Sequence, residues 1–298
     1  MEVIKFSLNS LPAKREGLTL ILGNFDGFHR GHQSLCLAAR IEAKSETGIL
    51  FFDIDSNAYI NNKKTFLMSL EDKINYARLN QIDLVYILET DSSLFNMSKD
   101  EFINNVLLPL GTEIIIVGSD YSFGKNKEGD INYLKHFFTV YSKEMITNLE
   151  GEKISSRDII IKIQNGKIEG ACIDLGHKYE IKGHIIQGKH LGRSLGFKTI
   201  NIDPCFDYVM PKDGVYYGLC FINGIPYNAL INVGKNPTVE VLEKSVIEAH
   251  LINFPDIDIY GKTVYVQFIK YHREERKFGS LEELKNQIQS DLDLFSLE

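Results

Sequence analysis

The sequence predicts an α/β domain built on a parallel sheet, followed by a small antiparallel β-barrel with a C-terminal helix. Three observations carry this prediction. The length of 298 residues corresponds to about two domains. Strand-like and helix-like segments alternate over the first half, which is typical of a parallel sheet with helices on both faces. After about residue 180 the chain turns to short β-rich segments divided by Gly, Pro, Asn and Asp, which indicates a small barrel.

The strands of the first half are expected where short, continuous apolar runs occur. Strands that are buried on both faces of a parallel sheet read as such runs rather than as alternating patterns. They are expected at 18–22, 48–52, 84–88 and 114–117, the last of which stops at Gly118.

The helices of the first half are expected from apolar spacing and from serine N-caps. Helical spacing over 31–44 predicts that Leu35, Ala38, Ala39 and Ile41 face inward. Serine N-caps predict two more helices, at 69–79 and 98–108. A further helical stretch, 155–176, should contain the domain boundary, and we divide the chain into domains 1–170 and 171–298.

The second half is expected to form the barrel and to end in a helix. Asn223–Gly224 between two β-rich runs is a strong hairpin signal. The tail from Ser280 has the amphipathic spacing of a helix with acidic residues near its start. The β-rich segments are 179–188, 214–224, 225–234, 245–254 and 262–271.

Composition narrows the classes of function. Lys and Arg number 33 against 40 Asp and Glu, a net charge of −7, which argues against a general nucleic-acid binder. The chain has no apolar run long enough to cross a membrane and no export signal at its start. Its four cysteines form no C-x-x-C pair. We therefore expect a cytoplasmic protein, a monomer or weak homo-oligomer, with neither nucleic acid nor membrane as partner.

The strongest motif is GNFDGFHRGH at 23–32, between an expected strand and an expected helix. The glycines, Gly23 and Gly31 among them, let backbone amides approach a phosphate, and a helix N-terminus favours negative charge. His29 and His32 are three positions apart and share one face of the first helical turn. The motif predicts a nucleotide site in which both histidines stabilise charge during phosphoryl transfer.

A second motif, VGSDYSFGKNKEGD at 117–130, follows the end of an expected strand. Parallel α/β sheets bind ligands outside the carboxyl ends of their strands. Gly124 and Lys125 in this segment are therefore expected to bind nucleotide. A solvated surface loop is the alternative interpretation.

A third motif, GKHLGRSLGFKTIN at 188–201, combines a glycine-rich segment with an extended one. Thr199 and Asn201 alternate onto one face and offer the hard oxygen ligands that suit Mg²⁺ bound to nucleotide phosphates. A glycine-rich β-turn is an equally common reading. The residues of the expected phosphate flap are Gly188, Lys189, Gly192, Arg193 and Gly196.

Glu248 stands in the otherwise apolar segment SVIEAHLINF. A carboxylate in such a strand is a poor structural choice unless it is paired or functional. Strand periodicity places Glu248 with Val246 and His250 on one face. It is a candidate general base for a hydroxyl nucleophile, and an ion pair facing solvent is the alternative.

Motif order and spacing resemble the prokaryotic bifunctional riboflavin kinase/FMN adenylyltransferases, also called FAD synthetases. GNFDGFHRGHQ resembles the family's first nucleotide motif, and Ile154–Ser156 resembles the start of its ISST motif. GRSLGFKTIN resembles the kinase motif GRTLGFPTAN. The segments GVYYG, NVGKNPTV, EAHLINF, IYG and REERKF then follow in the family's order. The resemblance covers nearly the whole chain.

The chain departs from the family pattern at a few places. Ile160 stands where the ISST motif ends in an arginine, FFDIDS replaces the usual FDPHP segment, and Lys198 replaces a proline. The first two departures lie in the adenylyltransferase half. We hypothesise that Arg157, three positions before Ile160, partly replaces the missing arginine.

The resemblance implies a Rossmann-like nucleotidyltransferase domain followed by a riboflavin-kinase barrel. The expected reactions are riboflavin plus ATP to FMN plus ADP, then FMN plus ATP to FAD plus pyrophosphate, with Mg²⁺ as cofactor. It further implies that Glu248 is the kinase base. The alternatives are a kinase with a degenerate N-terminal scaffold and a non-catalytic flavin or nucleotide regulator. The implied nucleotide-binding residues include Asn24, Phe25, Asp26, Ser155, Ser156 and Arg157, and the implied flavin-binding residues are Arg273 and Phe278.

Overall fold

The computed structural model divides the chain into two compact units, Met1–Ser156 and Arg157–Glu298. The division lies inside the helical stretch 155–176 where the sequence places the boundary; the finer division at 170/171 stays a prediction. The structure describes residues 1–54, 64–90, 94–144, 146–187, 199–235, 245–255, 257–276 and 278–295.

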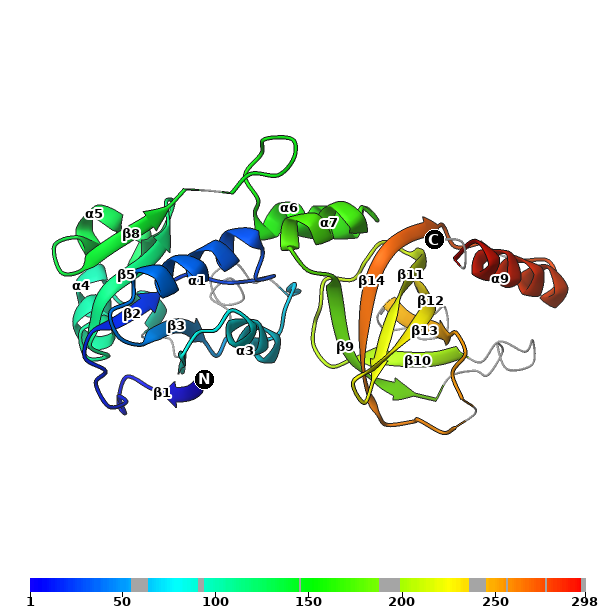
Figure 1. The fold of residues 1–298 in the computed structure, drawn as a ribbon, viewed down its shortest axis with the longest axis horizontal. Helices are drawn as coiled ribbons and strands as arrows, with labels where there is room; N and C mark the ends of the chain where they lie inside the picture. The colour runs from blue at the N-terminus through cyan, green and yellow to red at the C-terminus, as the bar shows by residue number, and fades with distance from the viewer. Residues whose placement is uncertain are drawn as a thin grey trace. The chain divides into compact units, whose positions relative to one another are not determined.

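The N-terminal unit contains a six-stranded parallel sheet with strand order β1-β4-β3-β2-β5-β8 (Figure 1). All four strands expected from the sequence are present. The two edge strands, β1 and β8, were not expected, and each has exposed residues. The strands are β1 (Glu2–Phe6), β2 (Leu18–Ile21), β3 (Thr47–Phe52), β4 (Leu84–Leu88), β5 (Thr112–Gly118) and β8 (Thr139–Lys143).

The three helices that the sequence predicts in this unit are present. Ser69 and Asp72 form a capping box at the start of α3 (Leu70–Leu79). Ser98 and Glu101 form another at the start of α4 (Lys99–Phe102), which continues as the π-helical turn η2 (Ile103–Leu107). In α1 (Arg30–Glu42) the residues Leu35, Ala38 and Ala39 are buried as expected. Ile41 is 69% exposed, so the expected inward position of Ile41 is wrong.

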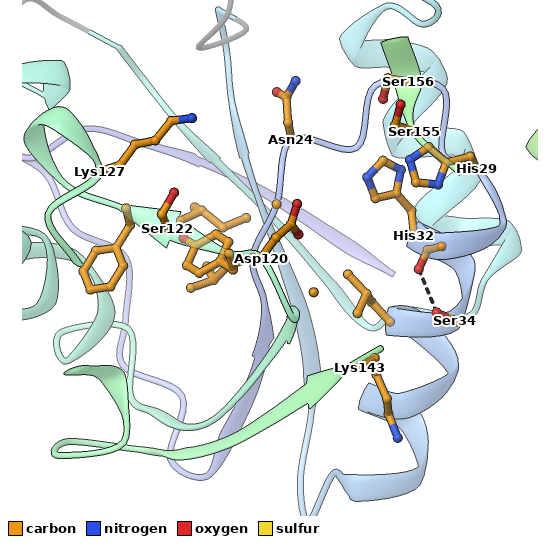
Figure 2. Close-up of a pocket in the computed structure, with 18 of the residues that line it drawn as sticks. Asn24, His29, His32, Ser34, Asp120, Ser122, Lys127, Lys143, Ser155 and Ser156 are labelled. Atoms are coloured by element: carbon orange, nitrogen blue, oxygen red, sulfur yellow. Dashed lines mark hydrogen bonds between the residues drawn. The ribbon is translucent and has the colours of Figure 1, made fainter. Parts of the chain in front are cut away.

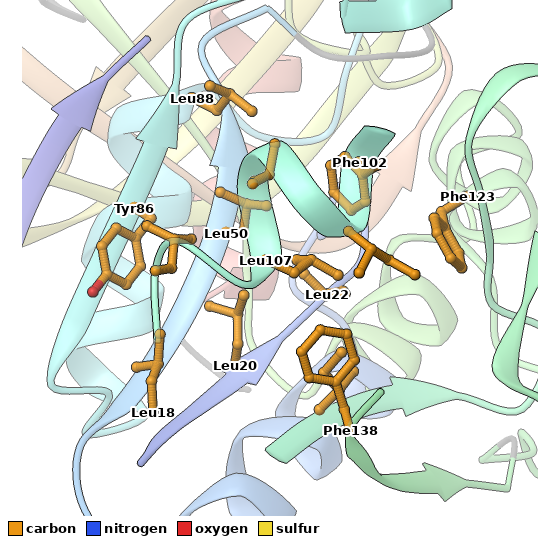
Figure 3. Close-up of a cluster of buried hydrophobic side chains, with 14 of the residues drawn as sticks. Leu18, Leu20, Leu22, Leu50, Tyr86, Leu88, Phe102, Leu107, Phe123 and Phe138 are labelled. Atoms are coloured by element: carbon orange, nitrogen blue, oxygen red, sulfur yellow. The ribbon is translucent and has the colours of Figure 1, made fainter. Parts of the chain in front are cut away.

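Two hydrophobic clusters cover the two faces of this sheet. One joins alternate residues of β2 to α4 and η2 and includes Leu18, Leu20 and Phe102 (Figure 3). The other joins the opposite face to α1 and α3 and includes Ile21 and Ala77. Because side chains alternate along β2, this strand contributes to both hydrophobic layers. The loop after β2 leaves from the carboxyl end of the strand.

A small excursion follows β5 in the N-terminal unit. The short strands β6 (Ser122–Phe123) and β7 (Gly129–Asp130) pair antiparallel around the turn η3 (Lys125–Lys127). The helix α5 (Ile131–Leu134) then leads to β8. Gly124 has φ +74°, and an added Cβ would lie 2.8 Å from the Lys99 backbone nitrogen. Glycine is therefore required where this excursion passes the start of α4.

The C-terminal unit is a closed antiparallel barrel preceded by two helices and followed by one (Figure 1). Asn223 (φ 53°) and Gly224 (φ 78°) form the tight turn between β11 and β12, as the sequence predicts. The barrel order is β10-β13-β12-β11-β14-β9. The elements are α6 (Ser156–Gln164), α7 (Ile168–Leu175), β9 (Tyr179–Ile186), β10 (Thr199–Pro204), β11 (Gly214–Ile222), β12 (Ile225–Lys235), β13 (Ser245–Leu251), β14 (Thr263–Arg273) and α9 (Leu281–Phe295).

Among the described helices, none combines the length and apolar character that a membrane crossing requires.

Candidate active site

The N-terminal unit holds a cavity of about 570 Å³ at the carboxyl ends of its strands. Leu22 and Gly23 follow β2, Phe52 ends β3, and Gly118 ends β5 at this edge. The position is the one where parallel α/β sheets bind ligands, and the volume suits a nucleotide-sized molecule. Figure 2 shows His29 and His32 beside Ser155 and Ser156 on one side, with Asp120, Ser122 and Lys127 on the other.

The turn between β2 and α1 carries the predicted motif in a strained conformation. Phe25 (φ 55°) and Phe28 (φ 41°) are non-glycine residues with positive φ, and both are fully buried. The Asp26 carboxylate accepts hydrogen bonds from the backbone amides of Leu67 (2.8 Å) and Met68 (3.3 Å). These contacts hold the turn so that its flanking residues face the cavity.

The two histidines stack at the start of α1. Their ring centroids are 3.7 Å apart and the rings are inclined by 19°. Burial, followed by the nearby His29 and Lys73, holds the pKa of His32 well below its usual value of 6.5. The Nδ1 atom of His32 is buried and has no hydrogen-bond partner among the described residues. A neutral imidazole offers one N–H donor and one acceptor nitrogen, which can engage a phosphate and its hydrogen-bond network.

Most of the predicted nucleotide-binding residues of this unit line the cavity, and three do not. Phe25 and Asp26 are fully buried under the turn, so they support its shape instead of facing the ligand space. Lys125 is exposed and lies outside the lining, whereas Lys127 of the same loop is part of it. The predicted residues that line the cavity are Gly23, Asn24, His29, Gly31, His32, Gly124, Ser155 and Ser156.

The ISST-like segment is tied to the motif turn. The Ser156 hydroxyl donates a hydrogen bond of 2.7 Å to the carbonyl of Asp26. Arg157 is the next residue in the chain, is exposed, and begins the C-terminal unit. The predicted roles of Ser155, Ser156 and Arg157 in binding phosphates stay predictions.

Sequence reasoning missed several charged residues of the cavity. Lys143 ends β8, an edge strand with no clear apolar pattern, and Lys153 lies in the segment before Ile154. Lys153 forms an ion pair of 2.5 Å with Asp120, which also lines the cavity. Lys127 belongs to the glycine- and lysine-rich loop at 117–130 that the sequence already singles out. These residues come together through the sheet order, which no local pattern reveals.

One wall of the cavity is apolar. Leu22, Leu50, Phe102 and Phe123 line it and belong to the hydrophobic cluster shown in Figure 3. The cavity therefore offers polar groups at the start of α1. Its apolar surface belongs to the other face of the sheet, which α4 and η2 cover. Such a division suits a ligand that carries phosphate at one end and a large flat ring at the other.

The C-terminal unit has a second polar cluster on the barrel strands. Ile247 and Ala249 are fully buried, whereas Glu248 between them is half-buried and lies on the opposite side of the sheet. The Thr199 hydroxyl donates a hydrogen bond of 2.7 Å to Glu248 Oε1. Asn201 of β10 is the register partner of Glu248. The structure thus brings Thr199, Asn201 and Glu248, which the sequence singles out, together on two neighbouring strands.

Asn232 and Glu275 extend this cluster and were not predicted. Asn232 of β12 pairs in register with Glu248 from the other side. Its Nδ2 atom donates a hydrogen bond of 2.9 Å to Glu275 Oε1. A Cβ at Gly234 would lie 2.2 Å from the same carboxylate oxygen, so glycine leaves the space that Glu275 occupies. The NVG segment at 232–234 is visible in the sequence. Its contact with Glu275 could not be predicted, because it depends on closure of the barrel.

The two predicted flavin-binding residues lie at the end of β14 and just beyond it. The Arg273 guanidinium donates to both carboxylate oxygens of Asp291 in α9, at 2.7 to 3.1 Å. Phe278 is half-buried and lies shortly before α9. Their flavin-binding roles stay predictions.

The predicted phosphate flap lies outside the described residues. It comprises Gly188, Lys189, Gly192, Arg193 and Gly196. Within the described ranges, no three His, Cys, Asp or Glu side chains are grouped to hold a metal ion. A cation here would depend on oxygen ligands of the Thr199 and Asn201 kind together with phosphates.

Comparison with known proteins matches each half of the chain to its own protein family. Residues 11–158 match the sequence model of FAD synthetase, and residues 175–296 match that of riboflavin kinase. The bifunctional riboflavin kinase/FMN adenylyltransferase of Haemophilus influenzae is 33% identical over 304 residues, covering 98% of this chain and 97% of the relative. The protein of that name from Listeria monocytogenes is 31% identical over 284 residues, covering 91% of this chain and 89% of the relative.

A solved structure shares the fold of this chain over nearly its whole length. A crystal structure described as a macrolide-efflux protein from Streptococcus pneumoniae covers 98% of both chains with a TM-score of 0.89 and 26% identity. Both units therefore have a counterpart of known fold. With the family models and the full-length relatives, the chain belongs to the family of bifunctional riboflavin kinases/FMN adenylyltransferases.

Proposed function

We infer that this chain carries out two consecutive reactions of flavin cofactor synthesis. The C-terminal unit phosphorylates riboflavin to FMN, and the N-terminal unit adenylylates FMN to FAD. The observation that carries this conclusion is that each half matches its own family model and holds its own polar cluster. ATP is the second substrate of both reactions.

In the kinase reaction, Glu248 acts as general base. It takes the proton from the terminal ribityl hydroxyl as that oxygen bonds to the γ-phosphorus of ATP, and the bond to ADP breaks. The hydrogen bond from Thr199 fixes one oxygen of the Glu248 carboxylate. Asn201 and Asn232 are the register partners of Glu248 on the two neighbouring strands.

Mg²⁺ fits the chemistry of this cluster. Thr199 uses its proton in the bond to Glu248, so the lone pairs of its oxygen remain available to a cation. The Asn201 side chain lies on the same face of the strand and offers an amide oxygen. Thr199 and Asn201 would hold the ion, which when bound neutralises charge on the phosphates of ATP.

In the adenylyltransferase reaction, a phosphate oxygen of FMN bonds to the α-phosphorus of ATP, and pyrophosphate leaves. His29, His32 and the backbone amides at the start of α1 donate hydrogen bonds to oxygens on which negative charge develops. The apolar wall with Leu22, Phe102 and Phe123 suits the flavin ring. No covalent enzyme intermediate is required.

Two separate assays test the proposal. The full chain is incubated with ATP and Mg²⁺ and either riboflavin or FMN, and the flavins are separated by chromatography. We expect FMN and then FAD from riboflavin, and FAD from supplied FMN. FMN formation without any FAD would support the kinase-only alternative, and neither product would support a binding protein. The cytoplasmic location and the monomeric or weakly oligomeric state stay predictions.

A further inference from the structure

Lys73 of α3 is a buried charge for which the mechanism above has no role. Its residue is only 7% exposed. Lysine is rarely buried to this extent unless its ammonium has a partner, because desolvation of the charge is costly. The Lys73 ammonium donates a hydrogen bond of 2.9 Å to the backbone carbonyl of Asn24. A helix from a distant part of the chain thus contacts the motif turn itself.

The contact falls next to one of the two non-glycine residues of the turn that have positive φ. Asn24 directly precedes Phe25, whose φ of 55° is unfavourable for a bulky residue. Such a conformation is unfavourable and persists only where surrounding contacts enforce it. The Leu67 amide and the Ser156 hydroxyl hold the following residue, Asp26, and Lys73 holds the preceding one, Asn24. Without Lys73 the side of the turn that leads out of β2 loses this support.

The same residue lies close to the reacting end of the cavity. Asn24, His29 and His32 all line the cavity. The charge of Lys73 acts on His32, where it adds to the effects of burial and of His29. Lys73 itself is absent from the lining. It therefore acts on the ligand site through the turn and the histidine pair, not by contact with substrate.

We propose that Lys73 is a positioning residue of the adenylyltransferase site, which holds the Gly23–His29 turn in the conformation that presents Asn24 and the paired histidines to the phosphates of ATP. This inference rests on the proposed function of the N-terminal unit. An error of about 1 Å in such a constellation can cost about 10²-fold in rate. The kinase reaction depends on residues of the other unit and serves as an internal control.

The test compares Lys73→Arg, Lys73→Gln and Lys73→Met in the full chain, with Lys44→Met as matched control. Lys44 is an exposed lysine of the same unit, paired with Glu113. We expect FAD formation from FMN to fall by about 10²-fold in Lys73→Met, chiefly in kcat. Lys73→Gln should lose less because it keeps a donor, and Lys73→Arg should lose least. FMN formation and the KM for FMN should stay at the wild-type level in all four variants.

Two results would overturn the inference alone. One is a Lys73→Met variant whose FAD formation stays within about threefold of wild type. The other is an equal loss in the Arg, Gln and Met variants, which would indicate packing alone. If Lys73→Met does not fold, Lys73→Arg and Lys73→Gln are compared instead. A smaller loss of FAD formation in Lys73→Arg supports the inference, and an equal loss in the two variants contradicts it. A wild-type protein that forms FMN but no FAD would contradict the proposed function as well as the inference.

Discussion

The histidine pair at the start of α1 shows how single residues are tuned in this protein. His32 is enclosed by Phe25, Phe28 and His29, with ring centroids 4.8, 6.4 and 3.7 Å away. Burial disfavours the charged imidazolium, and the neighbouring His29 and Lys73 disfavour it further, so the pKa of His32 is lowered. The residue therefore acts as a neutral hydrogen-bonding group at neutral pH.

The protonation state of His32 is directly measurable. At pH 6.5, where an ordinary histidine is half protonated, we expect ¹⁵N NMR of labelled protein to show His32 in a neutral form. His32→Gln assigns the signal. Below about pH 6.5 the unfolded chain takes up a proton at His32 that the folded chain does not. The free energy of unfolding therefore decreases as the pH falls below about 6.5. A protonated His32 signal at pH 6.5 would contradict this view of the site.

A second residue prediction concerns the arginine missing from the ISST-like motif. Arg157 and Ile160 both lie in the first turn and a half of α6, three positions apart, so they share a helix face. We expect Arg157→Ala to slow FAD formation from FMN by up to about 10²–10³-fold, the usual value of one charged donor to a transition state. FMN formation from riboflavin should not change. FAD formation at the wild-type rate would show that Arg157 does not replace the missing side chain.

Among the elements, α9 is fastened to the barrel by one buried carboxylate. Asp291 is fully buried and accepts hydrogen bonds from Arg273, His272 and Gln287. Burial acts to raise its pKa, but the bonds from Arg273 and Gln287 outweigh burial and hold the pKa below its usual range. Apolar contacts of Ile288, Leu292 and Phe295 with Val215, Tyr217 and Leu230 surround this ion pair.

This arrangement predicts a local effect of Asp291→Ala. The change leaves the mostly buried Arg273 without its carboxylate, and loss of one partner of such a pair costs about 3–5 kcal/mol. We expect amide hydrogen exchange in α9 to accelerate, while β2 to β5 exchange as in wild type. Asp293→Ala, at an exposed position of the same helix, is the control. Equal exchange of α9 in the two variants would contradict the role of Asp291.

The elements that could be predicted are those with local signals. Serine caps and apolar runs located the helices at 70–79 and 99–102 and the four central strands. The Asn223–Gly224 turn fixed one hairpin of the barrel. The edge strands β1 and β8 were missed because an edge strand is partly exposed and lacks a continuous apolar run.

The site was predictable only in part, for a related reason. His29, His32 and Gly31 lie in one short segment, and Glu248 is a conspicuous carboxylate in an apolar strand. Asp26 lies in the motif, but its orientation under the turn follows from contacts with residues more than forty positions away, at Leu67 and Met68. Lys73 and Glu275 reach the two sites only through tertiary packing.

At the scale of the whole molecule, each unit holds one of the two candidate sites. The histidine cavity lies within Met1–Ser156, and the Glu248 cluster lies within Arg157–Glu298. The product of the kinase reaction is the substrate of the adenylyltransferase reaction. If the sites act independently, removal of one catalytic group should block one step and leave the other intact.

The most direct test is a comparison of His29→Ala and Glu248→Gln with wild type, in which riboflavin and FMN are supplied separately with ATP and Mg²⁺. Glu248→Gln should form FMN about 10²–10⁴-fold more slowly yet convert supplied FMN to FAD at the wild-type rate. His29→Ala should form FMN normally and lose about 10²–10³-fold in FAD formation. Loss of both activities in either folded variant, or of neither in both, would contradict two independent sites in one chain.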